Sequence, residues 1–426
     1  MPITADLLIR NADTIYTCAG PAPRRGTQQG AIAPLHHASV ASSGGTIVFV
    51  GDAAACEADI ALTPEAVQID ARGRTLVPGF VDPHTHLVFA GDRRAELQRR
   101  LAGATYADIA AEGGGIVGTV SATRAASLQD LIDASLPRLS AMLACGTTTA
   151  EVKSGYGLDL ASELTALRAI RALDTMQPIE LVSTFMGAHE VPVEYRGRRD
   201  AYVRLIIDEM LPVVAREKLA DWCDVFCETG VFTPEESSAI LEAGRRHGLK
   251  ARIHADELAL SGGSAVAARI GARSADHLIF IDADHAKAMA QADVIATLLP
   301  AAAFYLKLGR FAPARMLVDA GVAVALATDV NPGGGFTPSM PFVITLACFG
   351  MNLTLEEALV GATINAAASL DLHHRVGSLE QGKQMDAVLI DGTLPDLVRV
   401  GAPVVQRVVK RGRVVWPMPS SGDSRT

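Results

Sequence analysis

The chain has 426 residues, of which 49% are hydrophobic and 20% charged, a composition typical of a globular protein with a large core. Its formal charge of −9 and pI near 5.7 argue against nucleic acid as the main partner, because binding phosphates requires clustered lysine and arginine. The longest apolar stretch, residues 341–353, is shorter than the ~20 residues that span a bilayer, so we expect no membrane segment.

Two further features favour a cytoplasmic protein. Residues 1–6 place no cationic segment before an apolar one, so we expect no secretory signal. Six cysteines in so long a chain do not suggest a disulfide framework. Cys223 and Cys227 have C-x3-C spacing but flank an apolar run with no second pair nearby, so we interpret them as buried strand residues rather than metal ligands.

Both ends of the chain are predicted to build one small β-sandwich domain, from residues 1–74 and 377–418. Residues 19–45 are polar and rich in Gly, Pro and Ser, and are predicted to form a long loop. Residues 419–426 are predicted to be a disordered tail. The predicted strands, short runs broken by Gly, Pro and Asn, are residues 7–9, 14–16, 46–50, 387–390, 404–405, 408–409 and 414–416.

Residues 75–376 alternate short apolar runs with segments of helical length. Continuous hydrophobicity over such runs is typical of parallel strands covered on both faces. The clearest helix is residues 233–247, with Thr233 as N-cap, Pro234 in the first turn and Glu236 completing a capping box. The predicted strands are residues 76–82, 147–152, 180–187, 223–228, 250–255, 274–278, 294–299 and 323–329. The sequence therefore predicts an α/β fold, a (β/α)8 TIM-like barrel.

Polar side chains follow seven of these eight strands, at the end where such barrels carry their catalytic groups. Only the seventh strand, which runs into Leu298, Leu299 and Pro300, offers nothing polar. The residues are Asp82, His84 and His86 after the first strand, Glu151, Lys153 and Tyr156 at the second, His189 at the third, Glu228 at the fourth, His254 and Glu257 at the fifth, His277 at the sixth, and Asp329 and Asn331 at the eighth.

Four of these residues predict a metal site. The spacing His84-x-His86 puts both imidazoles on one side of an extended backbone. Together with His254 and Asp329 they form a nitrogen and oxygen set suited to zinc or iron, with a position left for water. A lone H-x-H is as readily explained by packing, but four such groups at the same ends of different strands are not.

The same residues lie in strings that resemble the amidohydrolase superfamily: residues 77–86 (VPGFVDPHTH), 327–329 (ATD), 377–383 (GSLEQGK) and 386–388 (DAV). Within it the chain most resembles the imidazolonepropionase family, from about residue 44 to about residue 416. The strings that carry this likeness are residues 82–93 (DPHTHLVFAGDR), 112–116 (EGGGI), 151–158 (EVKSGYGL), 185–192 (FMGAHEVP), 254–257 (HADE) and 329–333 (DVNPG).

The resemblance implies a hydrolase that opens the ring of 4-imidazolone-5-propanoate, giving N-formimidoyl-L-glutamate in histidine degradation. An activated water attacks the cyclic amide carbonyl, and the ring nitrogen leaves after taking a proton. It also implies one divalent or trivalent ion per subunit, zinc or iron, and a small substrate that bears a carboxylate. A homodimer is the candidate assembly.

The resemblance further assigns roles to single residues. The ligands are His84, His86, His254 and Asp329. Glu257 transfers protons, and His277, assisted by Asp329, polarises the attacked group. Arg93 holds the substrate carboxylate, and the pocket is completed by Tyr156, His189, Glu257, Asn331, Gly333 and Gly334. One departure is Gly334, where family members usually carry Ser or Thr, so only backbone contacts are expected there.

Several alternatives remain open at this stage. Lys153 suggests a carboxylated lysine bridging two metals, but the resemblance gives it no such role and one metal is preferred. Gly113-x-Gly115-x-x-Gly118 matches a dinucleotide fingerprint but lacks a preceding strand, and a mobile loop over the pocket fits better. The competing functions are another mononuclear amidohydrolase, such as an aminoheterocycle deaminase, and a non-catalytic scaffold on the same fold.

Overall fold

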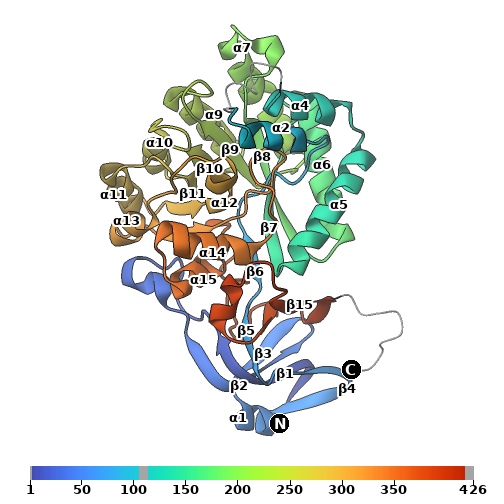
Figure 1. Cartoon of the computed structure of the whole chain (residues 1–426). Coiled ribbons are helices and arrows are strands. Elements are labelled where there is room, and N and C mark those ends of the chain that lie inside the picture. Colours follow the sequence, from blue (N-terminus) through green and yellow to red (C-terminus); the bar gives the residue numbers. More distant parts are fainter. Residues whose placement is uncertain (1, 105–113, 418–426) are drawn as a thin grey trace.

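The computed structural model describes residues 2–104 and 114–417, in which a barrel and a small β domain lie at opposite ends of the molecule (Figure 1). The predicted tail, residues 419–426, lies outside the described residues, as does Gly113 of the loop predicted over the pocket. The rest of that segment is described, and its residues 116–118 begin helix α4 (Ile116–Ala125). Within the described ranges, none of the helices is both long and apolar enough to cross a membrane.

The predicted (β/α)8 barrel is confirmed. Its strands pair in parallel and in chain order, so each strand lies beside the one before it. Most strand positions are buried, as expected for strands covered by helices outside and side chains inside. The strands are β6 (Phe80–Asp82), β7 (Thr147–Lys153), β8 (Glu180–Ala188), β9 (Trp222–Cys227), β10 (Lys250–Ala255), β11 (Ser274–His277), β12 (Ile295–Leu298) and β13 (Val324–Leu326).

The first and last barrel strands are joined by hydrogen bonds beyond their ends. The Thr328 backbone N–H and hydroxyl donate to the buried carboxylate of Asp82, at 3.0 and 2.5 Å. Farther along, the Asp329 N–H donates to the His84 carbonyl at 3.1 Å, and the His86 N–H donates to the Val330 carbonyl at 2.8 Å. The closure of the barrel therefore places the His84 and His86 segment directly beside Asp329.

The predicted single strand 76–82 is wrong in one respect, because it is two strands in two different sheets. β5 (Arg74–Pro78) pairs within the small domain, whereas β6 opens the barrel. Gly79 lies between them, and a Cβ there would lie 2.3 Å from Thr148 Oγ1. The absence of a side chain at Gly79 lets the chain pass from one sheet to the other against β7.

The small domain is built from both ends of the chain, as predicted. Its eight strands follow the order β16-β15-β14-β5-β1-β2-β3, and β4 pairs with β1. The predicted strands 7–9 and 14–16 are parts of one long strand with a register shift between Ile9 and Ala12. Besides β5, the strands are β1 (Ile3–Tyr16), β2 (Pro34–Ser43), β3 (Thr46–Asp52), β4 (Ile60–Asp70), β14 (Ala387–Asp391), β15 (Val405–Lys410) and β16 (Arg413–Trp416).

The prediction of a continuous loop over residues 19–45 is wrong in its second half, which is β2. The sequence of β2, PLHHASVASS, has few large apolar residues, yet Ala38 and Val40 are buried. β2 pairs with β1 on one side and β3 on the other. Backbone pairing with two neighbours therefore sustains a strand that its hydrophobic pattern does not reveal.

Helices connect the barrel strands, and the clearest predicted one is confirmed. In α9 the Thr233 hydroxyl accepts from the Glu236 N–H and the Glu236 carboxylate accepts from the Thr233 N–H, forming the expected capping box. The α-helices are α1 (Ala53–Asp59), α2 (Arg94–Leu101), α4 (Ile116–Ala125), α5 (Leu128–Ala144), α6 (Leu160–Met176), α7 (Arg199–Arg204), α8 (Leu211–Arg216), α9 (Pro234–Arg246), α10 (Gly263–Ile270), α11 (Ala283–Gln291), α12 (Pro300–Tyr305), α13 (Ala314–Asp319), α14 (Met340–Met351), α15 (Leu355–Gly361) and α16 (Ile364–Ser369). Shorter helical turns are η1 (Gly26–Gly30), η2 (Val193–Tyr195), η3 (Leu205–Met210) and η4 (Leu394–Val398).

Candidate metal centre and active site

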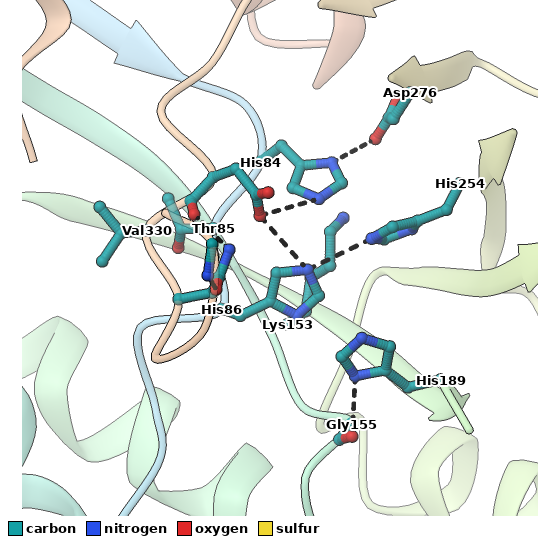
Figure 2. Close-up of polar contacts among 12 residues, drawn as sticks. His84, Thr85, His86, Lys153, Gly155, His189, His254, Asp276 and Val330 are labelled. Carbon is teal, nitrogen blue, oxygen red and sulfur yellow. Dashed lines mark hydrogen bonds and ion pairs between the residues drawn. The ribbon is translucent and has the colours of Figure 1, made fainter. Parts of the chain in front are cut away.

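The four predicted metal ligands converge at the carboxyl end of the barrel. Figure 2 shows three of them, His84, His86 and His254, pointing toward one another. Asp329 Oδ1 lies 3.7 Å from both His84 Nε2 and His86 Nε2. His86 Nε2 lies 3.2 Å from His254 Nε2. All four residues are buried, with at most 4% of their surface exposed. Side chains more than two hundred residues apart in sequence therefore present their donor atoms to one small space.

The histidines of this cluster fit a metal ion in orientation and in charge. His84 Nδ1 lies 2.7 Å from Asp276 Oδ2, and His254 Nδ1 lies 3.0 Å from Asp224 Oδ1. Each Nδ1 therefore donates to a carboxylate, which turns the Nε2 lone pair toward the centre. His84 Nε2 has no hydrogen-bond partner among the described residues. Burial, with nearby positive charge, holds the pKa of His84 well below its usual value, so the imidazole is the neutral form that binds metals.

His277 lies as close to this centre as the predicted ligands do. Its ring centroid is 5.1 Å from that of His254 and 5.4 Å from that of His84. His84, His254 and His277 could also hold an ion, since their donor atoms lie within 4.8 Å of one another. Neither ring nitrogen of His277 has a hydrogen-bond partner among the described residues. By geometry, His277 faces the centre together with the predicted ligands.

Backbone strain marks two of these positions. His277 has φ +75° and Asp329 has φ +55°, in the left-handed region that residues with a Cβ seldom adopt. Both residues stand at the carboxyl ends of barrel strands, where the backbone turns out of the sheet. Such strain persists only where the surroundings hold the residue in place, and it is concentrated at functional sites.

Glu257 stands beside His277, with its Oε2 3.6 Å from His277 Nε2. Burial, with the negative charges of Asp329 and Glu228, raises the pKa of Glu257 well above its ordinary value. The Glu228 carboxylate accepts hydrogen bonds from the backbone N–H groups of Glu257 and Leu258, at 3.1 and 2.8 Å, and so fixes this turn. A carboxyl group that can carry a proton is thus held next to an imidazole at the centre.

Tyr156 and His189 line the same space beside His86. The His189 ring stacks on that of His86, with centroids 4.8 Å apart, and lies 5.2 Å from that of Tyr156. His189 Nδ1 lies 2.9 Å from the Gly155 carbonyl oxygen, which can only accept (Figure 2). His189 therefore carries its proton on Nδ1, and burial lowers its pKa to about 3, so the ring is neutral.

Glu163 at the start of α6 fixes the Tyr156 loop, a role that was not predicted from the sequence. Its carboxylate is fully buried and accepts hydrogen bonds from the backbone N–H groups of Gly155, Gly157 and Leu158, at 3.1, 2.8 and 2.9 Å. Three N–H groups on one carboxylate hold the loop in a single conformation. A glutamate in the first turn of a helix just after a glycine-rich string is the signal that was available.

Arg93 reaches the loop that follows Asp329. Its Nε and Nη2 lie 2.9 and 2.8 Å from Glu96 Oε2, and the side chain is 9% exposed. A Cβ at Gly333 would lie 2.2 Å from Arg93 Nη1, so the guanidinium packs directly on the Gly333 backbone. The structure therefore brings together Arg93 and Gly333, two residues predicted to bind the substrate.

Asn331 uses its side chain within that loop. Its Oδ1 accepts from the N–H groups of Gly333 and Gly334, at 2.8 and 2.6 Å, and its Nδ2 donates to the Asp329 carbonyl at 2.8 Å. The side chain thus shapes the loop. At Gly334 a Cβ would lie 3.1 Å from Leu306, so a side chain there would require Leu306 to shift.

Lys153 is fully buried between two carboxylates, with its Nζ 2.8 Å from both Glu151 Oε1 and Asp224 Oδ2. Asp224 and Asp276 were not predicted, because the expected site comprised only residues at and beyond the strand ends. Both lie inside strands, on β9 and β11. Cys223 and Cys227 are buried on β9 and free, as expected.

Comparison with known proteins adds sequence and structural relatives. Residues 75–415 match the Amidohydrolase family. The imidazolonepropionase of Symbiobacterium thermophilum is 49% identical over 96% of this chain and 97% of its own, and that of Myxococcus xanthus is 47% identical over 96% and 97%. Among solved structures, Escherichia coli guanine deaminase superposes with a TM-score of 0.74 at 16% identity, covering 96% of this chain and 99% of its own. A zinc-bound adenosine deaminase from Xanthomonas campestris gives 0.69 at 19%, covering 97% and 93%. At such low identity these two structures show only that the fold is shared.

Proposed function

The chain belongs to the amidohydrolase family, and we propose that it is an imidazolonepropionase. Such an enzyme hydrolyses the ring of 4-imidazolone-5-propanoate to give N-formimidoyl-L-glutamate. The observation that carries the proposal is identity of 44–49% to imidazolonepropionases along almost the whole chain. The convergence of His84, His86, His254 and Asp329 supports it, because hydrolysing a cyclic amide at neutral pH requires an activated water.

In this proposal those four residues hold one zinc or iron ion. When bound, such an ion supplies Lewis-acid activation of water, whose pKa falls from ~16 toward ~7. Neutral imidazoles with one carboxylate are a donor set that both metals accept. The zinc bound by the Xanthomonas campestris adenosine deaminase belongs to that protein and is in keeping with this assignment.

Glu257 and His277 have different roles in the reaction: Glu257 transfers protons, and His277 polarises the carbonyl group. Glu257 accepts the proton released by the attacking water and delivers it to the ring nitrogen as the C–N bond breaks, as suits a carboxyl group whose pKa is raised by burial. His277, 3.6 Å away, orients and polarises the attacked carbonyl, assisted by Asp329. We assign His277 to the substrate rather than to the metal because it stands beside Glu257.

Arg93 holds the carboxylate of the substrate, with its guanidinium oriented by Glu96 and supported by the Gly333 backbone. Tyr156 and His189 form the wall next to His86. We place the reaction in histidine degradation in the cytoplasm, a reducing compartment in keeping with six free cysteines.

The test is to follow the loss of 4-imidazolone-5-propanoate by ultraviolet absorbance while assaying for ammonia. We expect the wild type to consume it without releasing ammonia, and His254→Ala and Arg93→Ala to lose most activity. His247→Ala, at an exposed histidine after α9, is the control and is expected to match the wild type. An inactive wild type, or one that releases ammonia from an aminoheterocycle, contradicts the proposal.

A further inference from the structure

Two of the predicted ligands, His84 and His254, each contact a buried aspartate, and each of these aspartates contacts a buried cation. In the first set, Arg252 Nη2 lies 3.1 Å from Asp276 Oδ2, which lies 2.7 Å from His84 Nδ1. In the second, Lys153 Nζ lies 2.8 Å from Asp224 Oδ2, and Asp224 Oδ1 lies 3.0 Å from His254 Nδ1. We name these sets the Arg252 relay and the Lys153 relay. Their side chains are at most 3% exposed.

We propose that the two relays are positioning devices for the metal centre, which hold His84 and His254 with Nδ1 protonated and Nε2 aimed at the ion. In this proposal Asp224 and Asp276 act through the two imidazoles and are not themselves ligands, although their oxygens lie within 4.8 Å of a His84 nitrogen. This inference rests on the metal site of the proposed function and adds to it four residues, Lys153, Asp224, Arg252 and Asp276.

The physical need for the cations follows from the burial of the aspartates. A carboxylate taken out of water loses its hydration, and this cost is offset only where buried cations or hydrogen-bond donors contact its oxygens. Arg252 contacts Asp276, and Lys153 lies between Asp224 and Glu151, so each aspartate has a buried cation beside one of its oxygens and is held in place as an acceptor for its histidine. An acceptor at Nδ1 selects the tautomer whose Nε2 lone pair is free for a metal.

Further contacts fix where each relay points. Asp224 Oδ1 also accepts from the His254 backbone N–H at 3.2 Å, so ring and backbone share one anchor. Asp276 Oδ1 accepts from the Ser274 hydroxyl at 2.7 Å, which leaves Oδ2 for His84 and Arg252. These contacts restrict the rotation of both carboxylates and hence of both imidazoles.

Both relays also reach the segment that carries His84 and His86. Arg252 Nη2 donates to the Pro83 carbonyl at 2.8 Å. Glu151, the second partner of Lys153, accepts from the Thr85 N–H at 3.3 Å. The cations therefore tie residues 83–85 to β7, β9, β10 and β11, and set the position of the histidine pair relative to the other strands.

His86 provides the contrast. Its Nδ1 has no hydrogen-bond partner among the described residues, and its ring is held by stacking on His189. The structure thus supports two ligands through carboxylates and the third through packing. Removing a relay is expected to weaken metal binding through one identified histidine while the other ligands keep their surroundings.

The test uses Asp224→Asn and Asp276→Asn, which keep the side-chain shape and remove the charge. The matched control is Asp386→Asn, because Asp386 is also buried beside a buried lysine, at 2.8 Å from Lys410 Nζ, but lies in the small domain. Among the described residues, its hydrogen-bond partners are Gln384, Lys410 and Arg411 rather than a histidine. The readouts are zinc affinity of the apoprotein, by chelator competition, and the visible absorption of the cobalt-substituted protein.

We expect each relay variant to bind zinc ~10–100-fold more weakly and to shift the cobalt bands, because the orientation and basicity of one ligand change. The control is expected to lose thermal stability yet keep wild-type affinity and spectrum. Ser274→Ala is a milder change that removes one hydrogen bond to Asp276. It is expected to weaken zinc affinity less than Asp276→Asn does, and it replaces Asp276→Asn in the test if that variant does not fold.

Wild-type affinity and spectrum in the folded relay variants would overturn the inference, as would an equal loss of affinity in Asp386→Asn. The outcome is separable from that of the proposed function. A wild type that binds zinc but leaves 4-imidazolone-5-propanoate intact overturns the substrate and not the relays. A wild type that binds no zinc overturns both the metal site and the relays.

Discussion

At the carboxyl end of the barrel, buried positions hold histidines and carboxylates, whereas the small β domain fills its core with aliphatic side chains. Leu7, Ile9 and Leu76 are each fully buried in that core. Around the metal centre, His84, Asp224 and Asp276 are buried just as completely. Apolar burial stabilises the fold directly, whereas buried polar groups cost free energy unless each finds a partner. Substitutions at the metal centre should therefore lower activity, whereas substitutions in the core of the small domain should lower the free energy of unfolding.

The largest expected effect comes from removing the metal. Dialysis against a strong chelator should abolish hydrolysis, because activation of water is worth several kcal/mol, on the order of a thousandfold in rate or more. Zinc or iron should restore it, and metal content should rise in step with activity. Full activity in protein shown by elemental analysis to be free of metal would contradict the proposed site.

His277→Ala separates a catalytic role from a ligand role. If His277 polarises the substrate, kcat should fall by ~10²–10⁴-fold while bound metal remains at the wild-type level. The comparison variant is His254→Ala, in which both metal and activity should be lost. Loss of metal in His277→Ala would instead place this residue among the ligands, as its closeness to His84 and His254 allows.

Leu7→Ala tests the other region. This residue is fully buried on β1, and truncation leaves a cavity in the small domain, so the free energy of unfolding should fall by ~2–5 kcal/mol. kcat and KM of the folded fraction should stay at wild-type values, since Leu7 packs in the core of the small domain, apart from the barrel core. Denaturant unfolding monitored beside activity measures both quantities. A change in kcat would show that the two regions are coupled.

The sequence predicted those parts of the molecule that have a local pattern, and missed those that depend on contacts between distant residues. The barrel strands were predictable because their apolar runs are continuous, and most site residues because they follow those runs at strand ends. β2 was missed because its ladder bonds to β1 and β3, rather than large apolar side chains, sustain it. Asp224 and Asp276 were missed because their role depends on contacts with Lys153, Arg252 and two histidines from other strands. Such contacts exist only after folding and leave no local pattern.

Arg93→Lys tests whether the shape of the guanidinium, as well as its charge, binds the substrate carboxylate. A lysine keeps the charge but lacks the planar fork that can bind a carboxylate through two N–H groups. Losing one charge-assisted hydrogen bond, worth ~1.5–3 kcal/mol, should raise KM about tenfold or more with a smaller change in kcat. Steady-state kinetics measure the split. Unchanged kinetics would mean that another residue binds the carboxylate.

Gly334→Ser should have the smallest effect and tests whether the space beside Gly334 limits the side chain that this position can carry. The φ of Gly334 lies outside the left-handed region, so only the space around it opposes a side chain. The new Cβ would lie 3.1 Å from Leu306, which is partly exposed and has room to shift. We expect a rise in KM of severalfold at most, because overpacking of ~1 kcal/mol is shared with a movable neighbour. Adding Leu306→Ala should reverse this rise if the contact is its cause, whereas a rise that persists in the double variant would place the cause in the Asn331 loop itself.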